Sequence, residues 1–274
     1  MPQEEKKVVH PVAIFKESWG FCQQHFQGLA RISAVIYLPV LVISVQMQMQ
    51  ILLKMAKPNL VFLLLGLMAT FISTWGHLAL TLFVNRAAGE GWSAGQSLSG
   101  AGKYFWPYIG ATILTFLFMA GFWITGGVLA VSAASLLWKI NKIIAILLTA
   151  AVAIACVSCT VYFMIRWLLY GVLCVTESAG PITALKRSHK LVKGYVNPVI
   201  GAYCLLILVY IAGSIPLSVL GATLRVLGAI GGKGNPIMSL IRVIYNTALN
   251  IVLIPLWASV SVVLYRKLKE AVEG

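Results

Sequence analysis

The chain of 274 residues is 60% hydrophobic and only 10% charged, with a mean hydropathy of +0.91. A soluble domain carries about 25% charged residues, so this composition excludes an ordinary water-soluble protein and favours one whose apolar side chains face lipid. The 21 Lys and Arg stand against seven Glu and no Asp, for a net charge of +14. Because these bases flank apolar segments instead of forming one basic domain, they favour anionic phospholipid head groups over nucleic acid as a partner.

Six apolar segments are long enough to cross a bilayer as helices, because roughly 20 apolar residues suffice. The third and fourth exceed a straight crossing and must tilt, extend past the bilayer or bend; Gly126-Gly127 is a candidate bend in the third. The sequence therefore predicts an all-α integral membrane protein with spans near residues 29–53, 60–84, 107–137, 143–174, 198–224 and 237–264.

The distribution of Lys and Arg over the connections predicts the orientation, since cytoplasmic connections carry an excess of both. If the N-terminus is cytoplasmic, thirteen of these bases lie inside and seven outside, with Arg166 left within a span. We therefore expect both termini in the cytoplasm.

A sequence repeat precedes the later pairs of spans. Residues 93–111 read SAGQSLSGAGKYFWPYIGA, and residues 184–202 read ALKRSHKLVKGYVNPVIGA. An offset of 91 aligns Ser97 with Ser188, the Tyr and Pro residues that follow, and Ile-Gly-Ala with Ile-Gly-Ala. A weaker copy over residues 14–28 has Ser18 in the place of Ser188. We interpret the chain as three repeats of an interfacial helix plus a transmembrane hairpin, near residues 10–85, 90–175 and 180–265.

The third copy has the pattern of a helix that lies in the head-group plane. At helical spacing, one face carries Ala184, Leu185, Ser188, Leu191, Val192, Tyr195 and Val196, and the opposite face carries most of Lys186, Arg187, His189, Lys190 and Lys193. Thr183 is the expected N-cap, and Gly194 is expected to end or bend the helix. The first copy is expected to bury Ile14, Phe15, Trp19, Cys22 and Phe26 in the same way.

Three stretches of the chain resemble a known family. Residues 175–194 read VTESAGPITALKRSHKLVKG, residues 264–270 read LYRKLKE after Pro255-Leu256, and an opening helix with Ser-Trp runs from Phe15 to Phe26. Together they resemble the glycerophosphoryl diester phosphodiesterase membrane-domain family and the related uncharacterised YciC-like membrane proteins. The resemblance implies a six-helix membrane module without the catalytic phosphodiesterase domain to which it is sometimes joined. The residues that match the family signature are Glu177, Pro181, Ala184, Ser188, Leu191 and Gly194.

Catalytic chemistry has little support in the residues. Phosphodiesterases need carboxylates or histidines to hold a metal and move protons, whereas this chain has four His, no Asp, and none of the common catalytic motifs. Cys156 and Cys159 form a CxxC without further ligands, and small packing residues are the favoured interpretation. We expect neither an enzyme nor a cofactor or metal site.

The candidate residues for head-group binding or helix orientation cluster around the third copy. Glu177 is either a fixed acceptor for Lys186, Arg187 or Arg166, or a solvated acid. Arg166 is either a functional intramembrane charge or a side chain that snorkels to the inner head groups. The full set is Arg166, Glu177, Lys186, Arg187, Ser188, Lys190 and Lys193.

Two functional hypotheses remain open. The first is a non-enzymatic scaffold, accessory or lipid-organising module that binds anionic phospholipids and possibly a membrane or soluble protein partner. The second is a small-solute or lipid transporter or channel, with His77, Asn246 and Asn250 on a polar path, although such residues more often form interhelical hydrogen bonds. The resemblance and the charge distribution suit a bacterial or archaeal plasma membrane.

Overall fold

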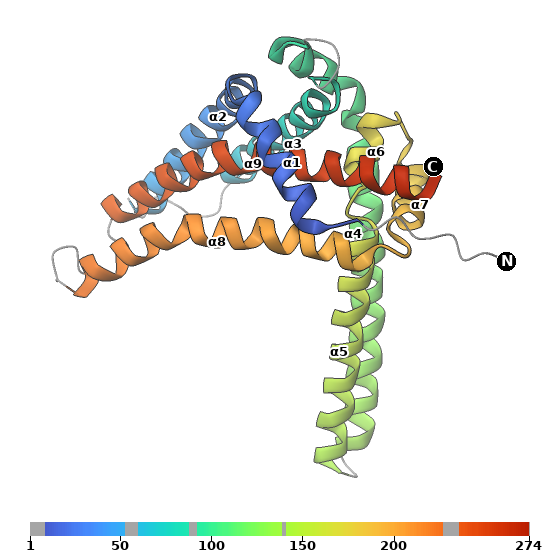
Figure 1. Ribbon diagram of the computed structural model, residues 1–274. Helices are drawn as coiled ribbons and strands as arrows, with labels where there is room; N and C mark the ends of the chain where they lie inside the picture. The colour runs from blue at the N-terminus through green and yellow to red at the C-terminus, as the bar shows by residue number, and fades with distance from the viewer. Residues whose placement is uncertain (1–8, 53–59, 88–91, 139–140, 227–235, 274) are drawn as a thin grey trace. The chain divides into compact units, whose positions relative to one another are not determined.

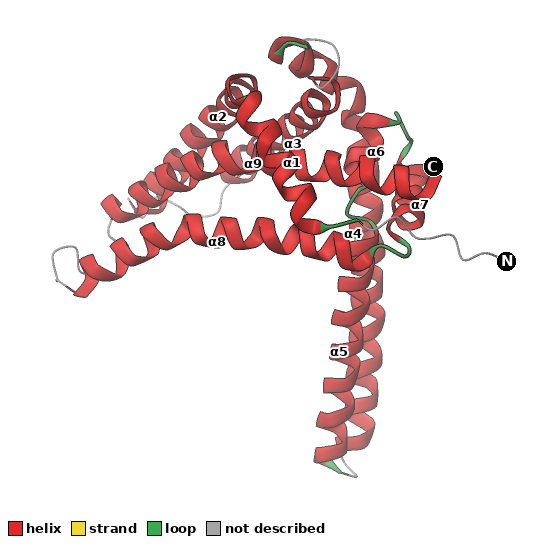
Figure 2. Ribbon diagram, in the orientation of Figure 1, coloured by secondary structure: helices red, strands yellow, loops and turns green. Residues whose placement is uncertain are grey.

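The computed structural model describes residues 9–52, 60–87, 92–138, 141–226 and 236–273, and within them all regular structure is helical (Figures 1 and 2). In chain order the helices are α1 (Pro11–Gln24), α2 (Phe26–Leu52), α3 (Leu60–Ala87), α4 (Ala94–Trp138), α5 (Lys142–Arg166), α6 (Tyr170–Thr176), α7 (Pro181–Val192), α8 (Val196–Val226) and α9 (Pro236–Glu273).

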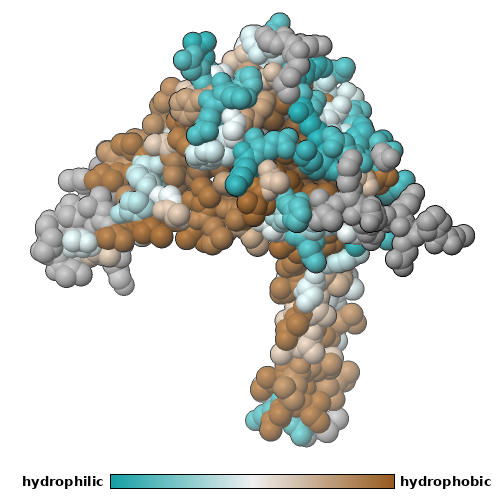
Figure 3. All heavy atoms as spheres, in the orientation of Figure 1, coloured by the Kyte–Doolittle hydropathy of each residue, from teal (hydrophilic) through white to brown (hydrophobic). Residues whose placement is uncertain are grey.

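The predicted all-α membrane class is confirmed. Six helical segments are long and apolar enough to cross a bilayer: α2, α3, α4, α5 with α6, α8 and α9. Large apolar side chains lie on their outer surfaces, and apolar surface covers the hairpin of α4 and α5 (Figure 3). An exposed apolar patch of this extent is a liability in water, but it is what a lipid-facing surface requires.

The chain forms two compact units. Unit 1 comprises residues up to Phe105 and from Asn197 onward, and its core forms where α9 packs against α1, α2 and α3. Leu256, Leu264 and Leu268 of α9 are fully buried there. Unit 2 comprises Trp106–Val196, which includes the greater part of α4 together with α5, α6 and α7.

The fourth span is interrupted. Helix α5 ends at Arg166, and α6 begins at Tyr170. By contrast, α4 is helical through Gly126-Gly127, the candidate bend. Gly126 also has a packing role, because a Cβ atom at this position would collide with Sγ of Cys156 on α5. Its missing side chain therefore lets the two helices approach closely.

The three sequence copies form helices of different kinds. The first is α1 and the third is α7, but the second, residues 94–105, runs directly into its span as the start of α4. One residue contributes to the difference between the second and third copies. Gly194, after α7, has a φ of 98°, and the offset of 91 places Lys103 at the equivalent point of the second copy. A side chain with a Cβ disfavours positive φ, so the second copy stays helical.

Replacing Gly194 with Ala is expected to lower the free energy of unfolding by at least about 1 kcal/mol, because the backbone there is strained for any other residue. Gly102→Ala is the matched control. Gly102 lies within α4 with open space around it, so Ala is expected to stabilise by roughly 0.5–1 kcal/mol. Denaturant unfolding in detergent measures both effects. Equal effects of the two substitutions would contradict the view that the backbone at Gly194 requires a glycine.

Each unit contains the same glycine–proline contact. In unit 2, a Cβ on Gly110 of α4 would lie 2.8 Å from Cγ of Pro181, the first residue of α7. In unit 1, a Cβ on Gly201 of α8 would lie 2.7 Å from Cγ of Pro11, the first residue of α1. The repeat aligns Gly110 with Gly201, and Ser18, Ser97 and Ser188 are all fully buried. The repeat remains a prediction, which these matching environments support.

Candidate functional site

Helix α7 has clear start and stop signals. Gly180 is the N-cap and Pro181 the first helical residue, where a proline costs no hydrogen bond and its fixed φ suits a helix. The expected cap, Thr183, lies in the first turn instead, so that prediction was wrong by one turn. The amide of Lys193 donates to the carbonyls of His189 and Lys190, and the positive φ of Gly194 then ends the helix.

The buried face of α7 lies within the predicted face, of which Leu185 and Val196 are half-buried. Ala184, Ser188, Leu191 and Val192 are buried, with the spacing of one side of a helix. This face packs against α6 and the end of α5. The apolar side of α7 therefore packs largely against protein, and this packing determines which way its basic side faces.

Ser188 joins α7 to the interruption of the fourth span. Its Oγ donates to the carbonyl oxygen of Arg166 at 2.8 Å and accepts from the amide of Leu169 at 3.3 Å. Groups at a helix end lack intrahelical partners, and Ser188 satisfies one acceptor and one donor there. The sequence placed Ser188 in the helix-orienting set, but its partners on residues 166 and 169 were not predictable from the spacing.

Ser188→Ala is expected to lower the free energy of unfolding by about 1–3 kcal/mol, since both backbone groups lose a buried partner. The matched control is Ser97→Ala, at the equivalent position of the second copy. Ser97 is equally buried, but its hydroxyl donates within its own helix to the carbonyl of Ser93. Unfolding in detergent should show the smaller loss for Ser97, and a reversed order would contradict the role given to Ser188.

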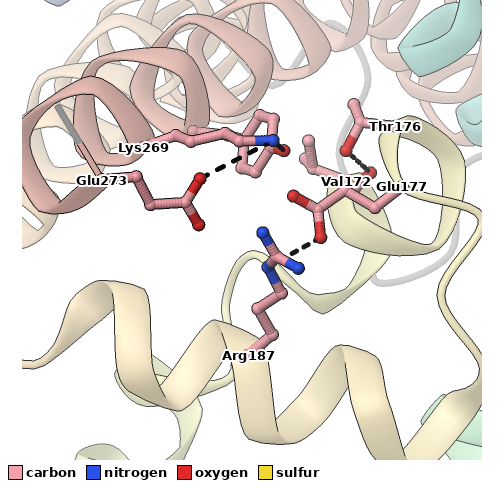
Figure 4. Close-up of polar contacts among 7 residues, drawn as sticks. Val172, Thr176, Glu177, Arg187, Lys269 and Glu273 are labelled. Atoms are coloured by element: carbon pink, nitrogen blue, oxygen red, sulfur yellow. Dashed lines mark hydrogen bonds and ion pairs between the residues drawn. The ribbon is translucent and has the colours of Figure 1, made fainter.

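An ion pair holds the opposite flank of α7. Of the three bases considered for Glu177, the structure pairs it with Arg187, whose Nε lies 2.8 Å from Oε2 of the carboxylate. Figure 4 shows the two side chains pointing toward one another, Glu177 from the end of α6 and Arg187 from α7. The Glu177 side chain is only 12% exposed, and that of Arg187 is 39% exposed. The ion pair is therefore mostly shielded from solvent. It orients α7 in addition to neutralising the two charges.

The remaining lysines of α7 and its C-cap face outward. Lys186, Lys190 and Lys193 are exposed, and residues 181–193 contain no acid. Because Arg187 is engaged with Glu177, these three lysines form the outward charge of this helix. We call Lys186, Lys190 and Lys193 the lysine face.

Arg166 is the last residue of α5, and the structure places its guanidinium carbon 5.0 Å from the centre of the Tyr162 ring. Its Nε and Nη1 are buried and have no hydrogen-bond partner within the described part of the chain. This arrangement is a cation–π contact. Its carbonyl accepts from Ser188, so the backbone of Arg166 helps to fix α7.

The candidate polar path lies in unit 1. His77 is half-buried on α3, and its carbonyl accepts from the Thr81 hydroxyl. Asn246 is exposed and Asn250 half-buried on α9. A cavity of about 160 Å³ between α1, α2 and α9 is lined by other, mainly apolar residues, including Trp19, Leu29 and Pro255. The polar path remains a prediction.

The expected apolar face of the first copy is only partly covered by protein. Of the five side chains on that face, Ile14 is the one that is fully covered by protein. Ser18, which was not among the five, is also fully buried. Trp19 and Phe26 are 44% and 56% exposed, and the amphipathic ring of Trp19 suits a membrane interface. Cys22 lies 3.2 Å from the Ser259 hydroxyl. Burial raises the pKa of the Cys22 thiol more than this contact lowers it, which favours the protonated thiol at neutral pH.

Arg266 has a role that the sequence analysis missed. Its Nη2 donates to the backbone carbonyl of Asn85 at 2.7 Å, near the end of α3, where carbonyls lack intrahelical partners. In the sequence, Arg266 counts among the inside bases and lies in the stretch LYRKLKE, and neither pattern points to α3. The two positions are far apart in the sequence, and no local signal connects them.

Among the described residues, no group of three or more His, Cys, Asp or Glu comes together in a way that could hold a metal ion. Comparison of the chain with protein-family models, with curated proteins and with solved structures finds no match. The class that the fold defines is thus an all-α, multi-pass membrane protein.

Proposed function

We propose that this protein is a non-enzymatic membrane module, a scaffold, accessory or lipid-organising protein, that binds anionic phospholipid head groups through the lysine face of α7. The observation that carries the proposal is that one set of residues fixes α7 in place while a second set on the same short helix stays exposed. Ser188 and the Glu177–Arg187 pair fix α7, while Lys186, Lys190 and Lys193 stay exposed. Such a helix presents fixed positive charge at the depth of the head groups.

The expected strength of the preference for anionic lipid follows from the number of lysines. A basic side chain near an anionic membrane surface contributes about 1 kcal/mol. Three lysines therefore give roughly 3 kcal/mol, or about a 100-fold preference for anionic over zwitterionic lipid. Exposed charges are screened by salt, so this preference is strongest at low ionic strength.

We further propose that the chain belongs to the glycerophosphoryl diester phosphodiesterase membrane-domain family, as three repeats in a bacterial or archaeal plasma membrane with both termini cytoplasmic. The signature residues in this chain have structural positions. Pro181 begins α7, Ala184, Ser188 and Leu191 are on its buried face, and Gly194 follows its end. Residues that seat a helix support a scaffold or accessory role more than a catalytic one.

The test is the salt dependence of lipid preference. The protein is reconstituted in vesicles of mixed phosphatidylglycerol and phosphatidylcholine, and spin-labelled lipids report which head group is retained at its surface. We expect phosphatidylglycerol to be preferred at low salt and the preference to fall steeply near 1 M, where the Debye length is about 3 Å. No preference at low salt would refute the proposal.

A further inference from the structure

A groove of about 640 Å³ lies within unit 2, between α4 and α7. On α4 its wall is formed by Leu114, Leu117 and Phe118, which share one helix face through their spacing of three and four residues. On α7 the wall is formed by Ile182, Leu185, Lys186 and His189, again at the spacing of one face. Trp167, between α5 and α6, completes the lining.

Both walls are held in place. Phe118 makes edge-to-face contacts with Phe163 and Trp167, at ring-centre distances of 4.8 and 5.1 Å. Helix α7 is fixed at its start by the contact of Pro181 with Gly110, and at its middle by the bonds of Ser188 to the chain beside Trp167. A groove between fixed walls is pre-organised, so a ligand that enters it orders little of the protein.

The chemistry of the lining changes along α7. The α4 wall and Trp167 are apolar or aromatic, and the two α7 residues Ile182 and Leu185 continue this surface. Lys186 and His189 are the two basic residues of the lining, and the lining contains no acid. The nearby carboxylate of Glu177 is paired with Arg187. An apolar channel with a basic end is complementary to an acyl chain with an anionic head.

We propose that this groove is a specific site for one anionic phospholipid, with an acyl chain between α4 and α7 and the phosphate beside Lys186 and His189. This inference deepens the proposed function and rests on it, since it gives the lysine face a resident lipid in addition to a general surface preference. Trp167 fits such a site, because Trp is favoured at the depth where acyl chains meet head groups.

The experiment fills the groove. Native mass spectrometry counts the phosphatidylglycerol molecules that stay bound to the full chain after extensive detergent exchange. Leu117→Trp places a larger side chain in the groove, and Ile182→Trp does so from the opposite wall. The matched control is Leu129→Trp, which changes a side chain of similar exposure, 61% against 59%, elsewhere on α4. A second comparison uses phosphatidylcholine in place of phosphatidylglycerol.

We expect the wild type and Leu129→Trp to retain one phosphatidylglycerol per chain. In both groove variants the retained amount should fall at least 10-fold. Lys186→Gln with His189→Gln should keep a lipid but no longer distinguish the two head groups. Full retention of phosphatidylglycerol by both groove variants would overturn the site, and so would equal retention of phosphatidylcholine by the wild type. The vesicle preference tests the proposed function separately, because Lys190 and Lys193 lie outside the groove and should sustain part of it in Leu117→Trp.

Discussion

Replacing Lys186, Lys190 and Lys193 together with Gln is expected to reduce the preference for anionic over zwitterionic phospholipid by roughly 100-fold at low ionic strength. The three ammonium groups are exposed, so their removal takes away head-group attraction without breaking a described contact of the buried face of α7. Gln keeps a polar side chain of similar length, and the fold should be unchanged. Spin-labelled lipids in mixed vesicles measure the preference.

The control for this variant removes the same charge elsewhere. Lys54, Lys57 and Lys142 belong to connections that the sequence predicts on the outer side of the membrane. Their replacement with Gln should leave the preference in the leaflet of α7 mostly intact, because a charge acts on head groups only within about a Debye length and these lysines are expected at the opposite leaflet. An equal loss in both triple variants would mean that net charge, and not the lysine face, governs lipid selection.

Replacing Arg187 with Gln is expected to lower the free energy of unfolding by about 3 kcal/mol, because it removes the cation from a mostly buried carboxylate. The Glu177 side chain is 12% exposed and lies 2.8 Å from the guanidinium. Glu177→Gln should cost less, since the arginine that remains is 39% exposed and can turn toward water. The double variant should recover part of the loss, and a double-mutant cycle in detergent measures this coupling.

The exposed pair of Lys269 and Glu273 provides the comparison. Its atoms are 4.0 Å apart, and both side chains are about 40% exposed or more. Removing one partner there should change the free energy of unfolding by no more than about 1 kcal/mol. A coupling energy near zero for Glu177 and Arg187 would contradict the view that their ion pair orients α7.

The membrane class and α7 were predictable because both follow from local patterns. Long apolar segments have few alternatives to a helix when the solvent is lipid. In the third copy, alternation at helical spacing separates Ala184 and Leu191 from Lys186 and Lys190, and the same two faces are present in the structure. Gly194 ended the helix as expected, because positive φ is a property of glycine that is visible in the sequence.

The features that were not predictable depend on contacts between distant segments. The partners of Ser188 lie 19 and 22 residues away, and those of Arg266 lie near the end of α3. The groove was not predictable from the sequence, because Leu114, Leu117 and Phe118 belong to a span in which most residues are apolar. Where nearly every position is hydrophobic, periodicity cannot distinguish a face that lines a groove from one that meets lipid.

The most direct test of anionic-phospholipid binding by this protein is native mass spectrometry of the protein released gently from its own membrane. Its conditions preserve whatever the lysine face and the groove hold there. We expect an anionic phospholipid to be retained at a proportion well above its share of that membrane. Retained phospholipids in the same proportions as the membrane, or a small solute held without any lipid, would contradict it.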